Sequence, residues 1–126
     1  MASSSTILMD TAEFSIIRQL IDQSDGGEIL HLVNAKTVYI HSTAALDYKL
    51  PKVAAHGGAE ADGGTWAPVD TTDAINIDMP TGEGLIEPTA SQAGMISESM
   101  MPLFLQLAHG STGAQATVYI YIIKRS

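Results

Sequence analysis

The chain has 126 residues, which is enough for one domain, and its composition is acidic but lightly charged. Six Lys and Arg against 14 Asp and Glu leave a formal net charge of −8. This balance argues against a nucleic-acid binder, because such proteins rely on basic side chains to displace counterions from phosphates. Charged residues make up only 16% of the chain, whereas average soluble domains carry about 25%. A surface so poor in charge is typical of a protein that a partner covers.

Cysteine is absent from the chain, which excludes disulfides, thiolate zinc sites and cysteine nucleophiles. The first ten residues, MASSSTILMD, have neither a basic region nor a long apolar run, so we expect no signal peptide. No window approaches 18 consecutive apolar residues, so we expect no membrane span. We therefore expect a single β domain over residues 1–126.

Residues 11–23 support two alternatives. Asp10 begins a stretch that resembles a helix capping box, and apolar residues from Phe14 onward fit a helical stripe. The same residues also alternate between apolar and polar, as a strand does, and we favour the strand. The SDGG sequence at Ser24–Gly27 predicts a hairpin turn into the next strand.

The segment Glu28–Ser42 (EILHLVNAKTVYIHS) is predicted to form two strands around a turn at Asn34–Lys36. Only a three-residue loop gives the hairpin one uniformly apolar face, and a slip of one residue would destroy it. The residues predicted to lie inside are Leu30, Leu32, Val38 and Ile40, and those predicted to lie on the other face are Ile29, His31, Val33, Tyr39 and His41. In this register His31 and His41 are diagonal neighbours, with Cβ atoms roughly 7–8 Å apart.

Residues 44–92 are rich in glycine and contain four of the five prolines, and we expect a long loop insertion here. One strand is predicted within it, at Ala74–Met79 (AINIDM). Loops of this length inside a compact domain are usually functional or ordered by a partner. A further strand is predicted at Gly94–Ser99.

The C-terminal part of the chain predicts a second hairpin. Leu103–Ala108 alternates, with Leu103, Leu105 and Leu107 on one side, and the turn-forming HGSTGAQ follows. Ala116–Lys124 (ATVYIYIIK) then places Val118, Ile120 and Ile122 on one face and Tyr119, Tyr121 and Ile123 on the other. Because both faces of this strand are apolar, we expect one to lie in the core and the other to be covered as well.

The sequence carries no arrangement that indicates an enzyme. Two histidines, His31 and His41, are too few for a zinc site, although a small metal-dependent enzyme using them is one hypothesis. The carboxylates of the middle segment fit no calcium-binding loop. There is no G-x-S-x-G nucleophile elbow and no phosphate-binding loop. We expect no catalytic residue, no metal and no cofactor.

The candidate functional residues are instead those of an interface. Tyrosine is enriched at interfaces because it buries a large area and keeps a polar tip. The alternative is that another segment of the same chain covers these side chains. Met95, Met100 and Met101 are expected to fill the core, with a contact surface as the second possibility. The residues predicted to form the interface are Tyr39, Tyr119, Tyr121, Ile123, Trp66, His31 and His41.

Three stretches together resemble small bacteriophage virion proteins. Leu32–Ser42 (LVNAKTVYIHS) is similar to a strand–turn–strand of those proteins, Ser91–Ser99 (SQAGMISES) to one of their turns, and Pro102–Ile123 to their closing hairpin. The three stretches cover about half of the chain. The long segment between Thr43 and Ser91 departs from the family pattern, as does His41-Ser42, where a glycine is common.

The resemblance implies an all-β fold, a small antiparallel β-sandwich (jelly-roll-like) with a long loop insertion in the middle. It implies a virion structural role, and we expect a capsid decoration (cement) protein that stabilises the head by bridging capsid subunits. The expected partners are the major capsid protein and sister copies in a homo-oligomer, with a trimer favoured by analogy. The expected location is the capsid surface, after synthesis in the host cytoplasm. The alternative is a receptor- or carbohydrate-binding module of a tail or fibre, with Trp66 and the acidic residues near it as the binding site.

Overall fold

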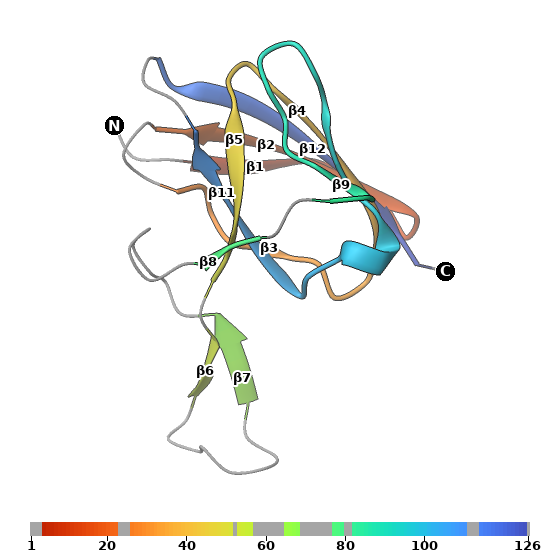
Figure 1. The fold of residues 1–126 in the computed structure, drawn as a ribbon. Coiled ribbons are helices and arrows are strands. Elements are labelled where there is room, and N and C mark those ends of the chain that lie inside the picture. The colour runs from red at the N-terminus through yellow and green to blue at the C-terminus, as the bar shows by residue number, and fades with distance from the viewer. Residues whose placement is uncertain are drawn as a thin grey trace.

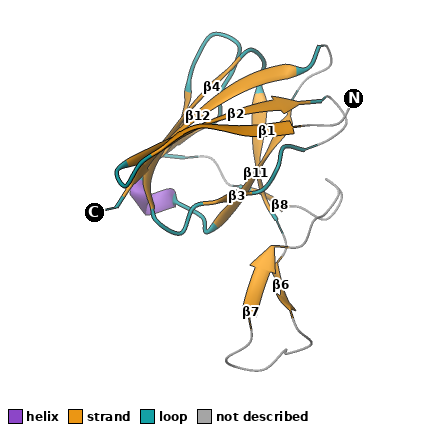
Figure 2. Cartoon of the chain, turned by 180° about the vertical axis from the view of Figure 1, so that it is seen from behind, coloured by secondary structure: helices purple, strands orange, loops and turns teal. Residues whose placement is uncertain are grey.

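The protein is almost entirely β-structure in the part of the chain that the computed structural model describes (Figure 1). All of the strand pairings are antiparallel, and two of the three sheets face each other as layers (Figures 1 and 2). The expected all-β, antiparallel, sandwich-like fold is confirmed. The described residues are 4–22, 26–51, 53–56, 65–68, 77–79, 82–110 and 114–125.

The larger sheet has six strands, and β12 lies near its middle between β2 and β4. Alternating β-branched and aromatic residues suit a strand that has neighbours on both sides. The predicted strand Ala116–Lys124 is confirmed with these bounds, and the strand alternative for residues 11–23 is confirmed by β2. In spatial order the strands are β1 (Ser4–Asp10), β2 (Phe14–Ile21), β12 (Ala116–Lys124), β4 (Ala35–Ser42), β10 (Gly94–Ile96) and β9 (Leu85–Ile86).

The smaller sheet has four strands and forms the second layer (Figure 1). A separate pair, β6 (Val53–His56) and β7 (Thr65–Pro68), makes a two-stranded sheet of its own. A 3-10 helix, η2 (Glu98–Met100), follows β10. In spatial order the four strands of the second layer are β3 (Leu30–His31), β11 (Phe104–His109), β5 (Leu46–Leu50) and β8 (Ile77–Asp78).

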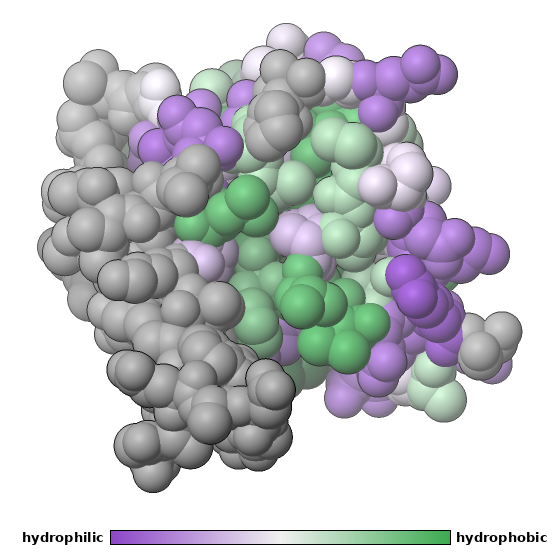
Figure 3. Space-filling view, turned by 60° about the horizontal axis from the view of Figure 1, so that its bottom comes forward, coloured by the Kyte–Doolittle hydropathy of each residue, from purple (hydrophilic) through white to green (hydrophobic). Residues whose placement is uncertain are grey.

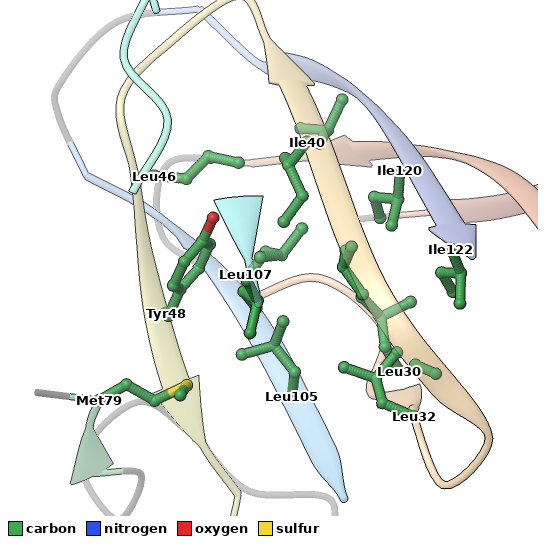
Figure 4. Close-up of a cluster of buried hydrophobic side chains, with 14 of the residues drawn as sticks. Leu30, Leu32, Ile40, Leu46, Tyr48, Met79, Leu105, Leu107, Ile120 and Ile122 are labelled. Carbon is green, nitrogen blue, oxygen red and sulfur yellow. The ribbon is translucent and has the colours of Figure 1, made fainter. Parts of the chain in front are cut away.

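The core lies between the two layers, where side chains from both sheets meet (Figure 4). The four residues predicted to lie inside the 28–42 segment are all buried there. Met100 and Met101 pack against the edge of this core, as expected of core-filling methionines. Met95, also expected to fill the core, instead pairs with the exposed Tyr39 and lies on the outward side of the larger sheet, because its place in β10 alternates with the buried Ile96. The labelled residues in Figure 4 are Leu30, Leu32, Ile40, Leu46, Tyr48, Met79, Leu105, Leu107, Ile120 and Ile122.

Residues 28–42 do not form the predicted hairpin. β3 pairs with β11 in one layer, while β4 pairs with β12 and β10 in the other. The chain turns at Val33–Asn34, where the Ala35 amide donates to the Leu32 carbonyl at 3.1 Å. Because this turn carries the chain from one sheet to the other, the apolar residues before it and after it both face the core between the two sheets. The burial pattern was therefore predicted correctly, whereas the pairing was wrong.

The glycines after β2 also connect the two layers and do not close a hairpin. Gly26 forms a bridge with Ala108, and the Gly27 amide donates to the Leu107 carbonyl at 2.7 Å. Residues 23–25, which include two of the four residues of the predicted SDGG turn, lie outside the described residues. β2 finds its partners in β1 and β12 instead.

The predicted insertion at 44–92 begins too early and ends too late. β5 lies inside it, and Tyr48 of β5 is fully buried in the core. Leu85 of β9 and Met79 are also buried. The predicted strand at 74–79 is present only as β8, and residues 74–76 lie outside the described residues. The prediction of a long loop relied on the many glycine and proline residues of this segment. The short strands were missed because a strand of two residues shows almost no alternation of apolar and polar residues.

Two element boundaries near the C-terminus also differ from the prediction. The expected strand at 94–99 ends at Ile96 and continues into η2. Leu103, predicted to lie on the same side of a strand as Leu105 and Leu107, precedes β11 and is 62% exposed, whereas Leu105 and Leu107 are buried. The main-chain carbonyl of Leu103 accepts a hydrogen bond from the Leu32 amide, which fixes the backbone while the side chain faces outward.

Tyr48 ties the smaller layer to the edge of the larger one. Its hydroxyl donates to the Ile86 carbonyl at 2.6 Å, and its amide donates to a carboxylate oxygen of Glu87 at 2.8 Å. Burial, and secondarily the Glu87 carboxylate, raises the pKa of the Tyr48 phenol well above its ordinary value. The hydroxyl therefore stays protonated and remains a donor. Among the described helical segments, none is long and apolar enough to cross a lipid bilayer.

Candidate interaction surface

The outward side of β12 carries the tyrosines that the sequence singled out. Tyr119, Tyr121 and Ile123 are each 38–39% exposed, whereas the alternating Val118 and Ile120 are fully buried. The strand therefore has two apolar faces, and only one of them is packed against the second layer. No other strand lies over the outward side among the described residues, so within this part of the chain the coverage expected for both faces is incomplete.

Register across the six-stranded sheet aligns apolar side chains from every strand into a single line. Direct antiparallel partners lie on the same face of a sheet. Each neighbouring pair along this line is a direct partner pair in the sheet. We call this set the apolar row; in spatial order from β1 to β9 it consists of Met9, Ile16, Tyr121, Tyr39, Met95 and Ile86.

The rest of the outward face is also nearly free of charge. By register, Phe14, Ile123 and Thr37 form a second line beside the apolar row, and Arg18, Tyr119 and His41 form a third. Arg18 is the only Lys, Arg, Asp or Glu among the outward positions of the paired strands. None of the residues in these three lines carries a carboxylate. We call these three lines together the outer face.

The two predicted interface histidines lie on different sheets. The His41 ring meets the edge of Tyr121 on the outer face, with ring centroids 5.9 Å apart. His31 is in β3, where its ring meets Phe104 at 5.1 Å. The prediction that they are diagonal neighbours is wrong, because their strands belong to separate layers. Within the described part of the chain, no three His, Asp or Glu side chains come together in a way that could hold a metal ion.

A hollow opens at one end of the outer face. It has a volume of about 390 Å³ and lies between the ends of β4 and β12 and the loop at residues 89–93. Tyr119 and His41 contribute rings to it, and Thr43 and Thr117 contribute to the same wall. The loop at residues 89–93 is held by a hydrogen bond from the Thr89 amide to the Gln92 carbonyl at 2.9 Å. Among the described residues that line the hollow there is no Asp, Glu, Lys or Arg.

A second exposed apolar region lies at the end of the sandwich where the 33–34 and 102–103 turns meet. Figure 3, which turns this end forward, shows apolar side chains gathered near the middle of the view. Val33 is 58% exposed and Leu103 is 62% exposed. The sequence placed Val33 outward but did not identify this region, because its two turns are far apart along the chain.

Trp66 lies in β7, opposite Ala55 of β6. Its side chain lies outside the described residues, as do the acidic residues near it. The structure therefore brings Tyr39, Tyr119, Tyr121, Ile123 and His41 together on the outer face, and it places His31 elsewhere.

No protein-family profile matches the chain, and no curated protein has a significantly similar sequence.

Proposed function

We propose that the protein is a non-enzymatic structural protein of a virion, a capsid decoration (cement) protein that stabilises the head by bridging capsid subunits. The observation that carries the proposal is the apolar row, which runs across all six strands of the larger sheet. Contiguous apolar surfaces of this kind mark association sites in soluble proteins. The resemblance of three stretches to small bacteriophage virion proteins supports the particular setting.

The attachment works by burial of the outer face against the major capsid protein. Tyr39 and Tyr121, which are direct partners, form the centre of the row, where interface energy is usually concentrated. Arg18 places one positive charge beside them, and none of the described residues in the three lines is acidic. The complementary capsid surface is therefore apolar and carries an acidic side chain within reach of Arg18. Contacts repeated over many equivalent sites on a shell make loss of the coat improbable through avidity.

The test is co-sedimentation of the purified protein with undecorated capsid shells. Tyr39→Ser and Tyr121→Ser together are expected to abolish binding, because they remove the two central rings of the row. Leu103→Ser is the matched control, since it removes a more exposed apolar side chain that lies off the outer face. Wild-type protein that fails to bind shells, or a double variant that binds as well as wild type, would contradict the proposal.

The hollow beside Tyr119 favours a second candidate, a receptor- or carbohydrate-binding module of a tail or fibre. An aromatic ring with hydroxyl groups around it, and no Asp, Glu, Lys or Arg among the described lining residues, suits a neutral, hydroxyl-rich ligand. Binding to host cells or an array of glycans distinguishes the two candidates. If the protein is such a module, it should bind host cells or glycans and should not bind capsid shells. Tyr119→Ala or Trp66→Ala should then abolish the binding to cells or glycans.

A further inference from the structure

β1 is the strand of the larger sheet that contributes least to the core. Every residue in it except Ser5 is exposed, and none belongs to the cluster of buried hydrophobic residues. It is the outermost strand of its sheet, and among the described residues it pairs only with β2. β2 in turn pairs with β12 over eight positions and buries Gln19 and Ile21. Opening of β1 alone therefore costs main-chain hydrogen bonds but little packed apolar surface.

A bulge divides β1 into two halves. Residues 4–7 pair in continuous register with residues 17–20 of β2, and residues 9–10 pair with residues 15–16. Leu8 lies between the two halves and has no direct partner in β2. A bulge leaves the extra residue unpaired and disrupts the ladder locally, so one half can move without the other.

Residues 9–10 are tied to β12 as well as to β2. The Lys124 ammonium of β12 donates to the Asp10 carboxylate at 2.7 Å and to the Thr11 carbonyl at 2.8 Å. The Ser15 hydroxyl of β2 donates to the same Asp10 oxygen at 2.6 Å. We call these four residues, Asp10, Thr11, Ser15 and Lys124, the clamp. It joins three strands at one end of the sheet.

Residues 4–7 have no comparable anchor among the described side chains. The Gln19 amide nitrogen lies 3.5 Å from the Ser5 hydroxyl, which is too long for a strong hydrogen bond. The same nitrogen donates to the Glu28 carbonyl at 3.0 Å. Ile7, the one large apolar residue of this half, is 66% exposed. Main-chain hydrogen bonds to β2 are therefore what holds residues 4–7 in place.

We propose that residues 4–7 form a strap that opens from β2 by itself, about a hinge at Leu8, while the clamp keeps residues 9–10 closed. Met9 lies beyond the hinge, so the apolar row keeps all of its members when the strap is open. Thr6 lies within the strap and is the direct partner of Arg18. Opening therefore uncovers the edge of β2 and removes one neighbour of Arg18, the only charged residue in the three lines of the outer face. The strap is a property of the free protein, so it stands or falls separately from the proposed attachment to a capsid.

Hydrogen exchange of the free protein under native conditions tests the strap, measured by nuclear magnetic resonance on the amides bonded between β1 and β2. The amides that join residues 4–7 to residues 17–20 are expected to exchange at least about tenfold faster than those that join residues 9–10 to residues 15–16. The amides between β2 and β12 are the internal reference and are expected to be the slowest. Equal exchange in the two halves, or exchange of residues 4–7 only as fast as the reference, overturns the inference.

A disulfide across the strap provides a second test. Direct partners in antiparallel strands have Cα atoms about 4.5–5.5 Å apart, which a disulfide can span, and the chain has no cysteine of its own. Oxidation of Thr6→Cys with Arg18→Cys is expected to slow exchange of the strap amides at least about tenfold relative to the reduced form. Met9→Cys with Ile16→Cys, on the other side of the hinge, is the matched control and is expected to leave the strap amides unchanged. Equal slowing by the two disulfides contradicts a hinge at Leu8.

The clamp is tested by Lys124→Gln and Asp10→Asn, singly and together. Each change is expected to speed exchange of the amides between residues 9–10 and 15–16 about twofold to fivefold, the effect of losing an exposed ion pair. The double variant is expected to add little, because either change alone breaks the pair. Lys49→Gln, which breaks an ion pair of the other sheet, is the control and should leave these amides unchanged. Effects of the two changes that add fully, or no effect of either, overturn the clamp.

Discussion

The two faces of β12 are almost equally apolar, yet only one of them is buried in the folded chain. Val118 and Ile120 on the inward face have no exposed surface, whereas Tyr119 and Tyr121 on the outward face keep more than a third of theirs. Hydrophobicity alone does not separate them. The difference is that the second layer covers one face, and no described segment covers the other. The inward face stabilises the fold, and the outward face is available for association.

The sharpest test of this contrast replaces the same residue type on each face. Ile120→Ala is expected to lower the free energy of unfolding by about 2–5 kcal/mol, because it leaves a cavity in a fully buried site. Ile123→Ala, on the outward face of the same strand, is expected to cost less than about 1 kcal/mol. Urea denaturation measures both. Equal losses would mean that the outward face contributes to the core as much as the inward face does.

A smaller effect is expected where the sheet edge is held to the second layer. A Cβ atom added at Gly94 would collide with the Tyr48 hydroxyl, the Pro88 ring and the Ile86 carbonyl, so Gly94→Ala is expected to cost about 1–3 kcal/mol. Gly82→Ala is the control, because nothing lies within 4 Å of its added Cβ. Thermal unfolding of both variants provides the comparison. A Gly94→Ala protein as stable as the control would show that the two layers are not tightly packed at this point.

Removing the Tyr48 hydroxyl tests the same connection from the other layer. Tyr48→Phe keeps the ring in the core but leaves the Ile86 carbonyl without its donor, at a cost of about 1–2 kcal/mol. Hydrogen exchange of β9 and β10 amides should also become faster than in wild type, because this bond anchors their edge. Unchanged stability together with unchanged exchange would contradict the anchoring role.

The smallest expected effect concerns Asp10 at the edge of the sheet and depends on pH. Hydrogen bonds from Lys124 and Ser15 hold the pKa of Asp10 below its ordinary value of 3.8. The unfolded chain then binds a proton more readily than the folded chain, so this contribution is present above the ordinary pKa and is lost as the pH falls through the folded pKa. Asp10→Asn should therefore be less stable than wild type at about pH 6, and this difference should shrink towards about pH 2. Denaturation midpoints at both pH values test it, and a difference that stays constant would contradict the assignment.

The alternation of side chains could be predicted from the sequence, whereas strand partners could not. Val38 and Ile40 are buried and Tyr39 and His41 are exposed, as their period-two pattern predicts. The same pattern is compatible with a hairpin or with a turn between layers, since both bury the same side chains. Only the partners in space, β12 for β4 and β11 for β3, distinguish them.

The outer face, too, was only partly predictable from the sequence. The outward position of the four β4 and β12 residues, Tyr39, Tyr119, Tyr121 and Ile123, was predictable from each strand alone. Their continuation into Met9, Ile16, Met95 and Ile86 was not, because it depends on the register of strands that are distant in the sequence. β5 was missed for a related reason, since its five residues lie beside a segment rich in glycine and their role depends on the buried ring of Tyr48.

The place of β12 in the larger sheet has a consequence for how the protein reaches its folded state. β2 and β4 belong to one sheet only because β12, the last described strand along the chain, lies between them and pairs with both. Phe14, for example, pairs with Ile123. Bringing together residues so distant in sequence costs a large loop-closure entropy before any favourable contact forms. This entropic cost slows folding. A ribosome would therefore have to release nearly all of the described chain before the sheet could close, and until then the apolar strands on both sides of the gap would stay exposed.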